Sequence, residues 1–253
     1  MVSISFVSLV LAAVANAVPL SEPGHKLAHG EMLLVGQNGT EVISQEAWHK
    51  LVEERGYLPE PPAWNQSWID DANHLKMLTH NESTIEKRDN CDHVTAIITD
   101  KVERFVNWDV QMSPVVIGYG TGMDVTITKS YTVSNSVTVS AGLDLNIIKH
   151  RLSSSLGVSL DRTWTTAQGY LIRGNVQDGE TGVVITTPWT NRRSGRVFQG
   201  CMGNQRMVGT WIADTYEDGA YEGVSWVGGA ITVCGKKQRG IPLSRCHGQG
   251  DFR

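Results

Sequence analysis

The side chains whose types and spacing could support chemistry gather between positions 211 and 226 of the chain. Carboxylates alternate there with tryptophan and tyrosine rings. Such rings stack on the apolar face of a sugar, and carboxylates accept hydrogen bonds from its hydroxyl groups. This pattern predicts a sugar-binding group; the alternative is that the rings are core residues flanking an acidic turn. The candidate residues are Trp211, Asp214, Tyr216, Tyr221 and Trp226.

Catalytic chemistry is not expected. Paired carboxylates occur only in this acidic turn, and the sequence contains neither a nucleophile motif nor a metal-binding motif. The glycine-rich residues 118–122 lack the spacing of a phosphate-binding loop and precede a strand pattern rather than a helix. We therefore expect no enzymatic activity, no metal and no cofactor.

The composition excludes some classes of protein. The 253 residues carry 22 basic and 26 acidic side chains, a formal net charge of −4. A protein that binds nucleic acid through its phosphates needs a large basic excess, so no nucleic-acid partner is expected. The hydrophobic fraction of 40% is too high for a wholly disordered chain. No internal run reaches the roughly 18–20 apolar residues of a membrane-spanning helix.

Residues 1–17 have the features of a signal peptide. Their apolar run ends in Ala15-Asn16-Ala17, the small-x-small pattern that signal peptidases accept. We predict cleavage after Ala17 and secretion, and therefore an oxidising environment in which disulfides persist. The alternative is a short buried N-terminal helix or strand.

Residues 18–88 predict a pro-segment. They are rich in proline, contain no cysteine and end in the dibasic pair Lys87-Arg88, which secretory processing proteases cut. Such a segment could aid folding or mask an interaction surface, and the alternative is an inert leader. Its glycosylation motifs are centred on Asn38, Asn65 and Asn81.

The pro-segment is expected to be partly helical. Ser44 can cap a helix over residues 45–55, and Gly56 can end it. Because the apolar stripe of this helix is narrow, the helix should pack weakly or against the mature domain.

Residues 89–253 predict an all-β domain, because strand-like stretches are frequent and helical periodicity is hard to find. The expected architecture is an elongated, twisted antiparallel sheet or sandwich with one long Ser/Thr-rich β-hairpin. Four cysteines in a secreted domain indicate two disulfides, for which three connectivities can be drawn. We favour Cys234 with Cys246 and Cys91 with Cys201.

The most informative pattern is an alternation of hydroxyl and apolar residues. Between 125 and 140 every even position is Ser or Thr and most odd positions are apolar, which predicts a strand with two different faces. A second alternating run covers residues 152–165. A hairpin that joins the two runs by a turn near Leu145 puts both apolar sets on one side, with Lys129 opposite Arg162.

The apolar part of this hairpin has the length of a membrane-crossing strand pair, and basic residues at its base can reach the membrane interface. The alternative is a pair of long strands in a sandwich, with one face in its core. The residues expected to face lipid or to form the apolar tip are Tyr131, Val133, Val137, Val139, Leu143, Leu145, Ile147, Ile148, Leu156, Val158 and Leu160.

Together these features resemble the pore-forming module of aerolysin-type toxins. The resemblance rests on the Ser/Thr-rich runs around an apolar tip, on Thr163-Trp164-Thr165-Thr166 and on residues 178–182, and it covers about residues 120–190. It implies a secreted, protease-activated precursor that assembles into rings, in which each protomer contributes one hairpin to a shared barrel. It implies no catalytic residues.

Two functional hypotheses follow. The first is a secreted, proteolytically processed toxin or effector that perturbs target membranes by hairpin insertion after oligomerisation. Its partners would be a processing protease, further copies of the chain, and a target membrane or cell-surface receptor. The second is a soluble secreted effector or a cell-surface or carbohydrate-binding protein without membrane activity.

Overall fold

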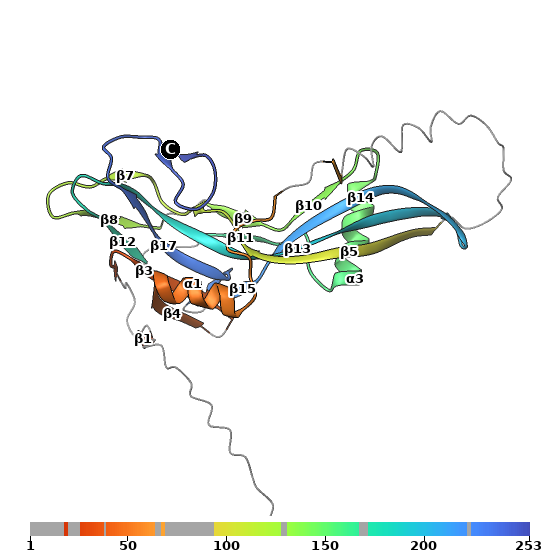
Figure 1. The fold of residues 1–253 in the computed structure, drawn as a ribbon, viewed down its shortest axis with the longest axis horizontal. Coiled ribbons are helices and arrows are strands. Elements are labelled where there is room, and N and C mark those ends of the chain that lie inside the picture. Colours follow the sequence, from red (N-terminus) through yellow and green to blue (C-terminus); the bar gives the residue numbers. More distant parts are fainter. Residues whose placement is uncertain are drawn as a thin grey trace, which may run out of the picture.

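The computed structural model describes residues 18–19, 26–37, 39–63, 67–68, 94–127, 131–166, 172–221 and 224–253. Strand is the dominant element, so the predicted all-β class with a large antiparallel sheet is confirmed. A strand of 21 residues, β13 (Thr181–Cys201), runs through the molecule (Figure 1). The molecule is elongated because different strands flank the two halves of β13.

The half of β13 that ends at Cys201 forms the distal sheet, with strand order β5–β13–β14–β10. β5 (Val94–Val106) pairs with one side of β13, and β14 (Asn204–Tyr216) pairs with the other. The far side of β14 pairs with β10 (Ser136–Val139). All three pairings are antiparallel.

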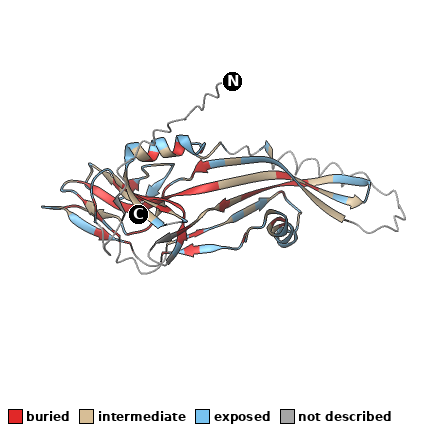
Figure 2. Ribbon diagram, turned by 90° about the horizontal axis from the view of Figure 1, so that it is seen from below, coloured by how far each residue is buried: buried red, intermediate tan, exposed pale blue. Residues whose placement is uncertain are grey.

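The half of β13 that begins at Thr181 forms the proximal sheet and carries the densest core (Figure 2). β17 (Gly229–Lys236) pairs with this half, and β3 (Glu31–Gly36) and β4 (Gly39–Ser44) extend the sheet beyond it. Smaller pairings complete the sheet. Its short strands are β1 (Val18–Pro19), β6 (Val110–Gln111) and β7 (Val116–Ile117).

Small sheets pack around these two halves. β2 (Lys26–Leu27), β12 (Arg173–Val176) and β8 (Met123–Thr126) form one of them. The others are the pairs β9 (Thr132–Ser134) with β11 (Thr163–Thr165), β15 (Asp218–Tyr221) with β16 (Val224–Val227), and β18 (Leu243–Ser244) with β19 (Asp251–Phe252).

A disulfide fixes the C-terminal loop to the proximal sheet. Cys234 in β17 bonds Cys246, 12 residues later, which confirms that predicted pair. Leu243 and Phe252 then pack against Val183 and Ile185 of β13. Cys201 is also disulfide-bonded, while Cys91 lies outside the described residues.

Residues 26–37 and 39–63, which we call the N-terminal segment, belong to the main fold. The predicted helix is confirmed as α1 (Gln45–Glu54), with the Ser44 hydroxyl accepting a hydrogen bond from Ala47 N at 3.1 Å. β3 extends the main sheet, and the segment adds residues to two core clusters, so these residues pack as part of the folded domain. The core residues that they supply are Leu27, Met32, Leu33, Val35, Trp48, Val52 and Tyr57.

The prediction of one long continuous hairpin over residues 125–165 is wrong. Residues 145–156, expected to form part of the tip and the start of the second strand, are instead the helix α3 (Leu145–Leu156). Among the described residues, the two runs pair with each other as strands only in β9 and β11, with Ser134 opposite Thr163. This register brings Asn135, rather than Lys129, next to Arg162: Asn135 N donates to Arg162 O at 3.0 Å. Lys129 itself lies outside the described residues.

The reason for this error lies in the spacing of the apolar residues. Ile148, Leu152 and Leu156 are four positions apart, so they share one side of a strand and one face of a helix equally well. Local signals decide for the helix. The Asp144 carboxylate caps the N–H groups of Asn146 and Ile147, and Gly157 ends the helix in the left-handed conformation at φ 65°.

Candidate functional site

The predicted sugar-binding group is not assembled on the surface. Trp211 is fully buried in the core cluster between the distal sheet and α3. Trp226 belongs to a different core cluster from that of Trp211. Asp214 is bound by Arg192, with Nε–Oδ1 and Nη2–Oδ2 distances of 2.7 and 2.8 Å. The rings are therefore core residues, as in the alternative interpretation, and the side chain of Tyr221 lies outside the described part.

The polar members of that group form a structural network. Burial, followed by the negative charge of Asp214, raises the pKa of Tyr216 to about 12. Its hydroxyl oxygen accepts a hydrogen bond from Asn107 Nδ2 at 3.0 Å. Arg192 also lies over the ring of Phe105, 4.9 Å from its centroid. These contacts hold Asp214 and Tyr216 inside the fold, and the two buried indole N–H groups, Trp211 Nε1 and Trp226 Nε1, lie in separate core clusters rather than in one site.

The strands before and after α3 keep the predicted two faces. In β9 and β10, Thr132, Ser134, Ser136 and Thr138 are exposed, whereas Val133, Val137 and Val139 are buried or half-buried. β11 repeats the pattern, with Trp164 buried between two exposed threonines. The alternation therefore sets a hydroxyl face toward solvent and an apolar face toward the protein.

Residues 140–160, which we call the covering segment, lie against one face of the distal sheet. Ile148 and Leu152 of α3, together with Leu160, are buried against Val197 and Trp211 of the sheet. At about 1.5–3 kcal/mol for each buried aliphatic side chain, this packing is the main attachment of the segment. The predicted lipid-facing residues in this same cluster are Val137, Val139, Leu143, Ile148, Leu156, Val158 and Leu160.

The other predicted lipid-facing residues lie elsewhere. Val133 is buried in the core cluster shared with the proximal sheet, and Tyr131 is hydrogen-bonded to the backbone of Ser113 at 3.2 Å. Leu145 and Ile147 are exposed on α3, at 38% and 49%. The structure thus brings together most of the predicted set, but as a docked helix with its flanks rather than as a hairpin.

A glycine permits the close approach of the covering segment at its N-terminal end. Ser140 N donates a hydrogen bond to Thr210 O at 3.0 Å, and Ser140 Oγ accepts one from Thr210 N at 3.0 Å. A Cβ on Gly209 would overlap Ser140 Oγ and lie 2.8 Å from Leu143 Cδ1. Position 209 therefore needs glycine. A glycine inside a strand can mark such a close approach of a neighbouring segment.

Polar contacts attach the rest of the covering segment to the strands beside it. Lys149 Nζ pairs with Asp161 Oδ1 at 2.9 Å, and Asn135 Nδ2 donates to Ser159 O at 2.7 Å. Arg151 Nη1 donates to Thr95 O at 3.0 Å, which joins α3 to β5. No local sequence pattern predicts this Arg151 contact, because Thr95 is 56 positions away.

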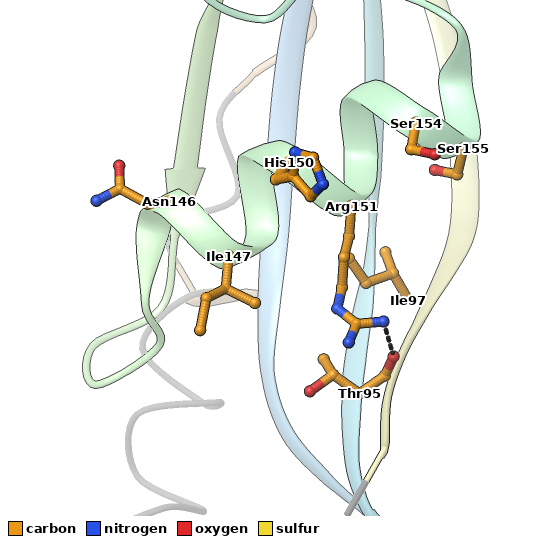
Figure 3. Close-up of a pocket in the computed structure, with 8 residues that line it drawn as sticks. All are labelled: Thr95, Ile97, Asn146, Ile147, His150, Arg151, Ser154 and Ser155. Atoms are coloured by element: carbon orange, nitrogen blue, oxygen red, sulfur yellow. Dashed lines mark hydrogen bonds between the residues drawn. The ribbon is translucent and has the colours of Figure 1, made fainter.

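A groove of about 910 Å³ opens between α3 and β5. Figure 3 shows Arg151 reaching from α3 to the backbone of Thr95, with Ile97 beside it. The groove lies along the seam between the covering segment and the sheet. Its lining residues are Thr95, Ile97, Asn146, Ile147, His150, Arg151, Ser154 and Ser155.

A second cavity of about 260 Å³ lies under α1. Asp109 lines it and is buried, with Oδ2 accepting a hydrogen bond from His247 N at 2.7 Å. Burial raises the pKa of the Asp109 carboxyl above its usual 3.8, although backbone donors and the charges of His247 and Arg245 oppose the shift. This carboxylate anchors the C-terminal loop.

Several predicted features fall outside the described residues, namely Ala17, Asn38, Asn65, Asn81, Lys87 and Arg88. In the part of the chain that is described, no helix has both the length and the hydropathy to cross a bilayer. No cluster of three or more metal-ligand side chains occurs in that part either. Comparison of the chain with protein-family models, curated proteins and solved structures finds no match.

Proposed function

We propose that this protein is a secreted, proteolytically processed toxin or effector that perturbs target membranes. Its active element is the chain from Tyr131 to Thr166. In the stored state, the covering segment is folded on the distal sheet. On activation it detaches, its helix unfolds, and β9–β10 and β11 extend into a membrane-inserted hairpin, after copies of the chain have come together.

One observation carries this proposal. Seven of the residues expected to face lipid lie in a single cluster on the distal sheet. Side-chain packing holds most of them there, whereas the neighbouring strands are held by backbone ladders. Exchanging this apolar surface for lipid breaks the short pairing of β10 with β14 and leaves the long ladders of β13 with β5 and β14 intact.

The flanking strands support the same interpretation. Their exposed residues are Ser and Thr and their inward residues are apolar, as a hairpin with a lipid face and an aqueous face requires. The disulfide between Cys234 and Cys246 fits the secretion that the N-terminal residues predict. Cleavage after Arg88 is the proposed processing step.

Dye release from liposomes tests the proposal, with the chain intact and after cleavage at Arg88. Cleaved protein is expected to release dye. Val137→Asp should suppress release, because it places a carboxylate on the lipid face of the inserted strand. Thr138→Asp is the matched control: it adds the same charge to the neighbouring residue, which is exposed here and would face water after insertion.

Absence of release at every protein concentration, cleaved or intact, would overturn the proposal and favour the soluble binding protein. Equal loss of release in Val137→Asp and Thr138→Asp would also contradict it, since the two faces would then be equivalent. Circular dichroism and a thermal transition confirm that both variants are folded.

A further inference from the structure

The cavity under α1 is lined partly by the N-terminal segment and partly by the rest of the domain. Trp48 and Val52 of α1 line it, and so do Val106 and Ile185 from the strands β5 and β13. All four side chains are buried, so much of the wall is apolar. The volume of about 260 Å³ lies just below the roughly 300–1,000 Å³ of drug-sized ligand pockets, and it therefore suits a molecule of a few non-hydrogen atoms.

The protein uses only one oxygen of the Asp109 carboxylate in this cavity. Oδ2 accepts a hydrogen bond from His247 N at 2.7 Å, whereas Oδ1 is buried without any hydrogen-bond partner. Asp109 is only 1% exposed. Burial raises its pKa despite the donors and charges around it, so the contacts that the chain supplies do not fully compensate the carboxylate for lost water. A ligand that donates to Oδ1 would supply what is lacking.

A second unpartnered polar atom belongs to the same cavity. His247 also lines it, and its Nε2 is buried without a hydrogen-bond partner. Asp109 N donates to His247 O at 3.0 Å, and the adjacent Cys246 is bonded to Cys234, so the position of this histidine is fixed. As a neutral imidazole with its proton on Nδ1, it accepts a hydrogen bond at Nε2. An ammonium group carries three donors and can serve both atoms.

The charges around the cavity favour a cation. The carboxylates of Asp109 and Glu60 line it, and among its described lining residues there is no lysine or arginine. The charge of Arg245 acts on Asp109, but its guanidinium donates to the backbone O of Asp109 and lies 4.8 Å from the centroid of the Phe252 ring. An anion would meet two carboxylates here, and a purely apolar molecule would leave Oδ1 without a donor.

We propose that the cavity under α1 binds a small aliphatic amine. Its ammonium group bonds to Asp109 Oδ1, and its hydrocarbon part packs against Trp48, Val52 and Ile185. Because the N-terminal segment supplies part of the wall, the bound amine also stabilises the attachment of that segment to the domain. The proposal does not depend on membrane activity.

Thermal unfolding at a constant chloride concentration tests the proposal, with n-butylammonium chloride as the probe. A ligand that binds the folded chain raises the unfolding midpoint, and a rise of a few degrees is expected at saturation. n-Butanol keeps the hydrocarbon chain and lacks the charge, and sodium chloride supplies a cation without the chain. Neither should raise the midpoint.

Asp109→Asn locates the binding site. The change keeps the shape of the side chain and removes its charge, so the dissociation constant for n-butylammonium, taken from the midpoints, should rise at least about tenfold. Asp251→Asn is the matched control, because it removes the same charge from an exposed residue of β19. It should leave the dissociation constant unchanged.

The absence of a midpoint shift at every amine concentration would overturn the proposal and leave water as the occupant of the cavity. Equal shifts with n-butanol or with sodium chloride would also overturn it, as would equal weakening in the two variants. If Asp109→Asn does not fold, the comparison of amine with alcohol on the unmodified chain decides. All of these measurements are made without membranes and without cleavage at Arg88, so their failure is distinct from failure of the proposed function.

Discussion

The N-terminal segment and the covering segment both lie on the main sheet, but they are attached in different ways. The N-terminal segment joins the sheet through its backbone, since β3 pairs with β17 and Leu58 bonds to β5. The covering segment lies on a face of the sheet, where α3 is held by apolar packing and a few side-chain hydrogen bonds.

Aromatic packing strengthens the first attachment. The rings of Trp48 and Tyr57 each lie 4.5 Å, centroid to centroid, from the ring of Trp189 in β13. Tyr57 donates a short hydrogen bond to Glu217, and burial followed by this bond raises the pKa of the tyrosine, so it stays protonated. No comparable buried aromatic set ties α3 to the sheet in the described residues.

This difference indicates which segment can move. Removing the N-terminal segment would break a backbone ladder and expose two core clusters, whereas lifting α3 would expose one cluster and leave every ladder of β13 intact. The N-terminal segment, which was expected to be removable, is thus more strongly attached to the main sheet than the covering segment is. Proteolysis after Arg88 is expected to leave the N-terminal fragment bound.

The largest effect is expected from Trp189→Ala. This change deletes the ring that Trp48 and Tyr57 contact, and a buried tryptophan truncated to alanine costs about 3–5 kcal/mol. Urea unfolding measures the loss. Met202→Ala, in a turn where the side chain is 86% exposed, should change the free energy of unfolding by less than about 0.5 kcal/mol.

Trp189→Ala also tests the attachment of the N-terminal segment after cleavage at Arg88. In the unmodified chain the two fragments should co-elute in size exclusion, and in Trp189→Ala the N-terminal fragment should dissociate. Release of that fragment from the unmodified chain would contradict the firm attachment described here.

A smaller and local effect is expected from Leu152→Ala. Leu152 lies on the buried face of α3, and its truncation should weaken the packing of the covering segment on the sheet by about 2–5 kcal/mol. Hydrogen exchange should quicken in residues 145–156 and stay unchanged in β13. Ser154→Ala, on the exposed side of the same helix, should not quicken it. Equal acceleration in β13 would show that the segment is not an independent unit.

Gly209→Ala should loosen the covering segment at its N-terminal end. The new methyl group would overlap Ser140 Oγ, and such overpacking costs about 1–3 kcal/mol. Hydrogen exchange at residues 140–144 measures the effect. Gly36→Ala is the control, because its Cβ would meet only Gly39 O, at an ordinary 3.7 Å. Similar changes in both variants would refute the special role of Gly209.

The smallest effect is a pH dependence at the cavity under α1. Because burial raises the pKa of Asp109, the folded state binds the proton more tightly than the unfolded state does. This contribution to stability is fully present below the unfolded value of 3.8 and is lost as pH rises through the raised pKa. Relative to Asp109→Asn, the unmodified chain should therefore gain stability as pH falls from 7 toward 4.

Urea midpoints measured at several pH values, for the unmodified chain and Asp109→Asn, check this expectation. Asp251→Asn, at an exposed residue of the C-terminal loop, is the control and should follow the unmodified chain. A stability difference that grows in the opposite direction would mean that the Asp109 carboxylate is stabilised by its charge in the fold.

The sequence by itself determined the features that depend on neighbouring residues. The Ser44 cap and α1, the two-faced strands around Val133 and Val137, and the Cys234–Cys246 pair all follow from local spacing and chemistry. Only the tertiary structure decided between helix and strand for residues 145–156, because a four-residue apolar spacing fits both and the sheet face below supplies the partner. It also decided that β3 pairs with β17, since strand pairing between segments about 200 positions apart leaves no local signal in either of them.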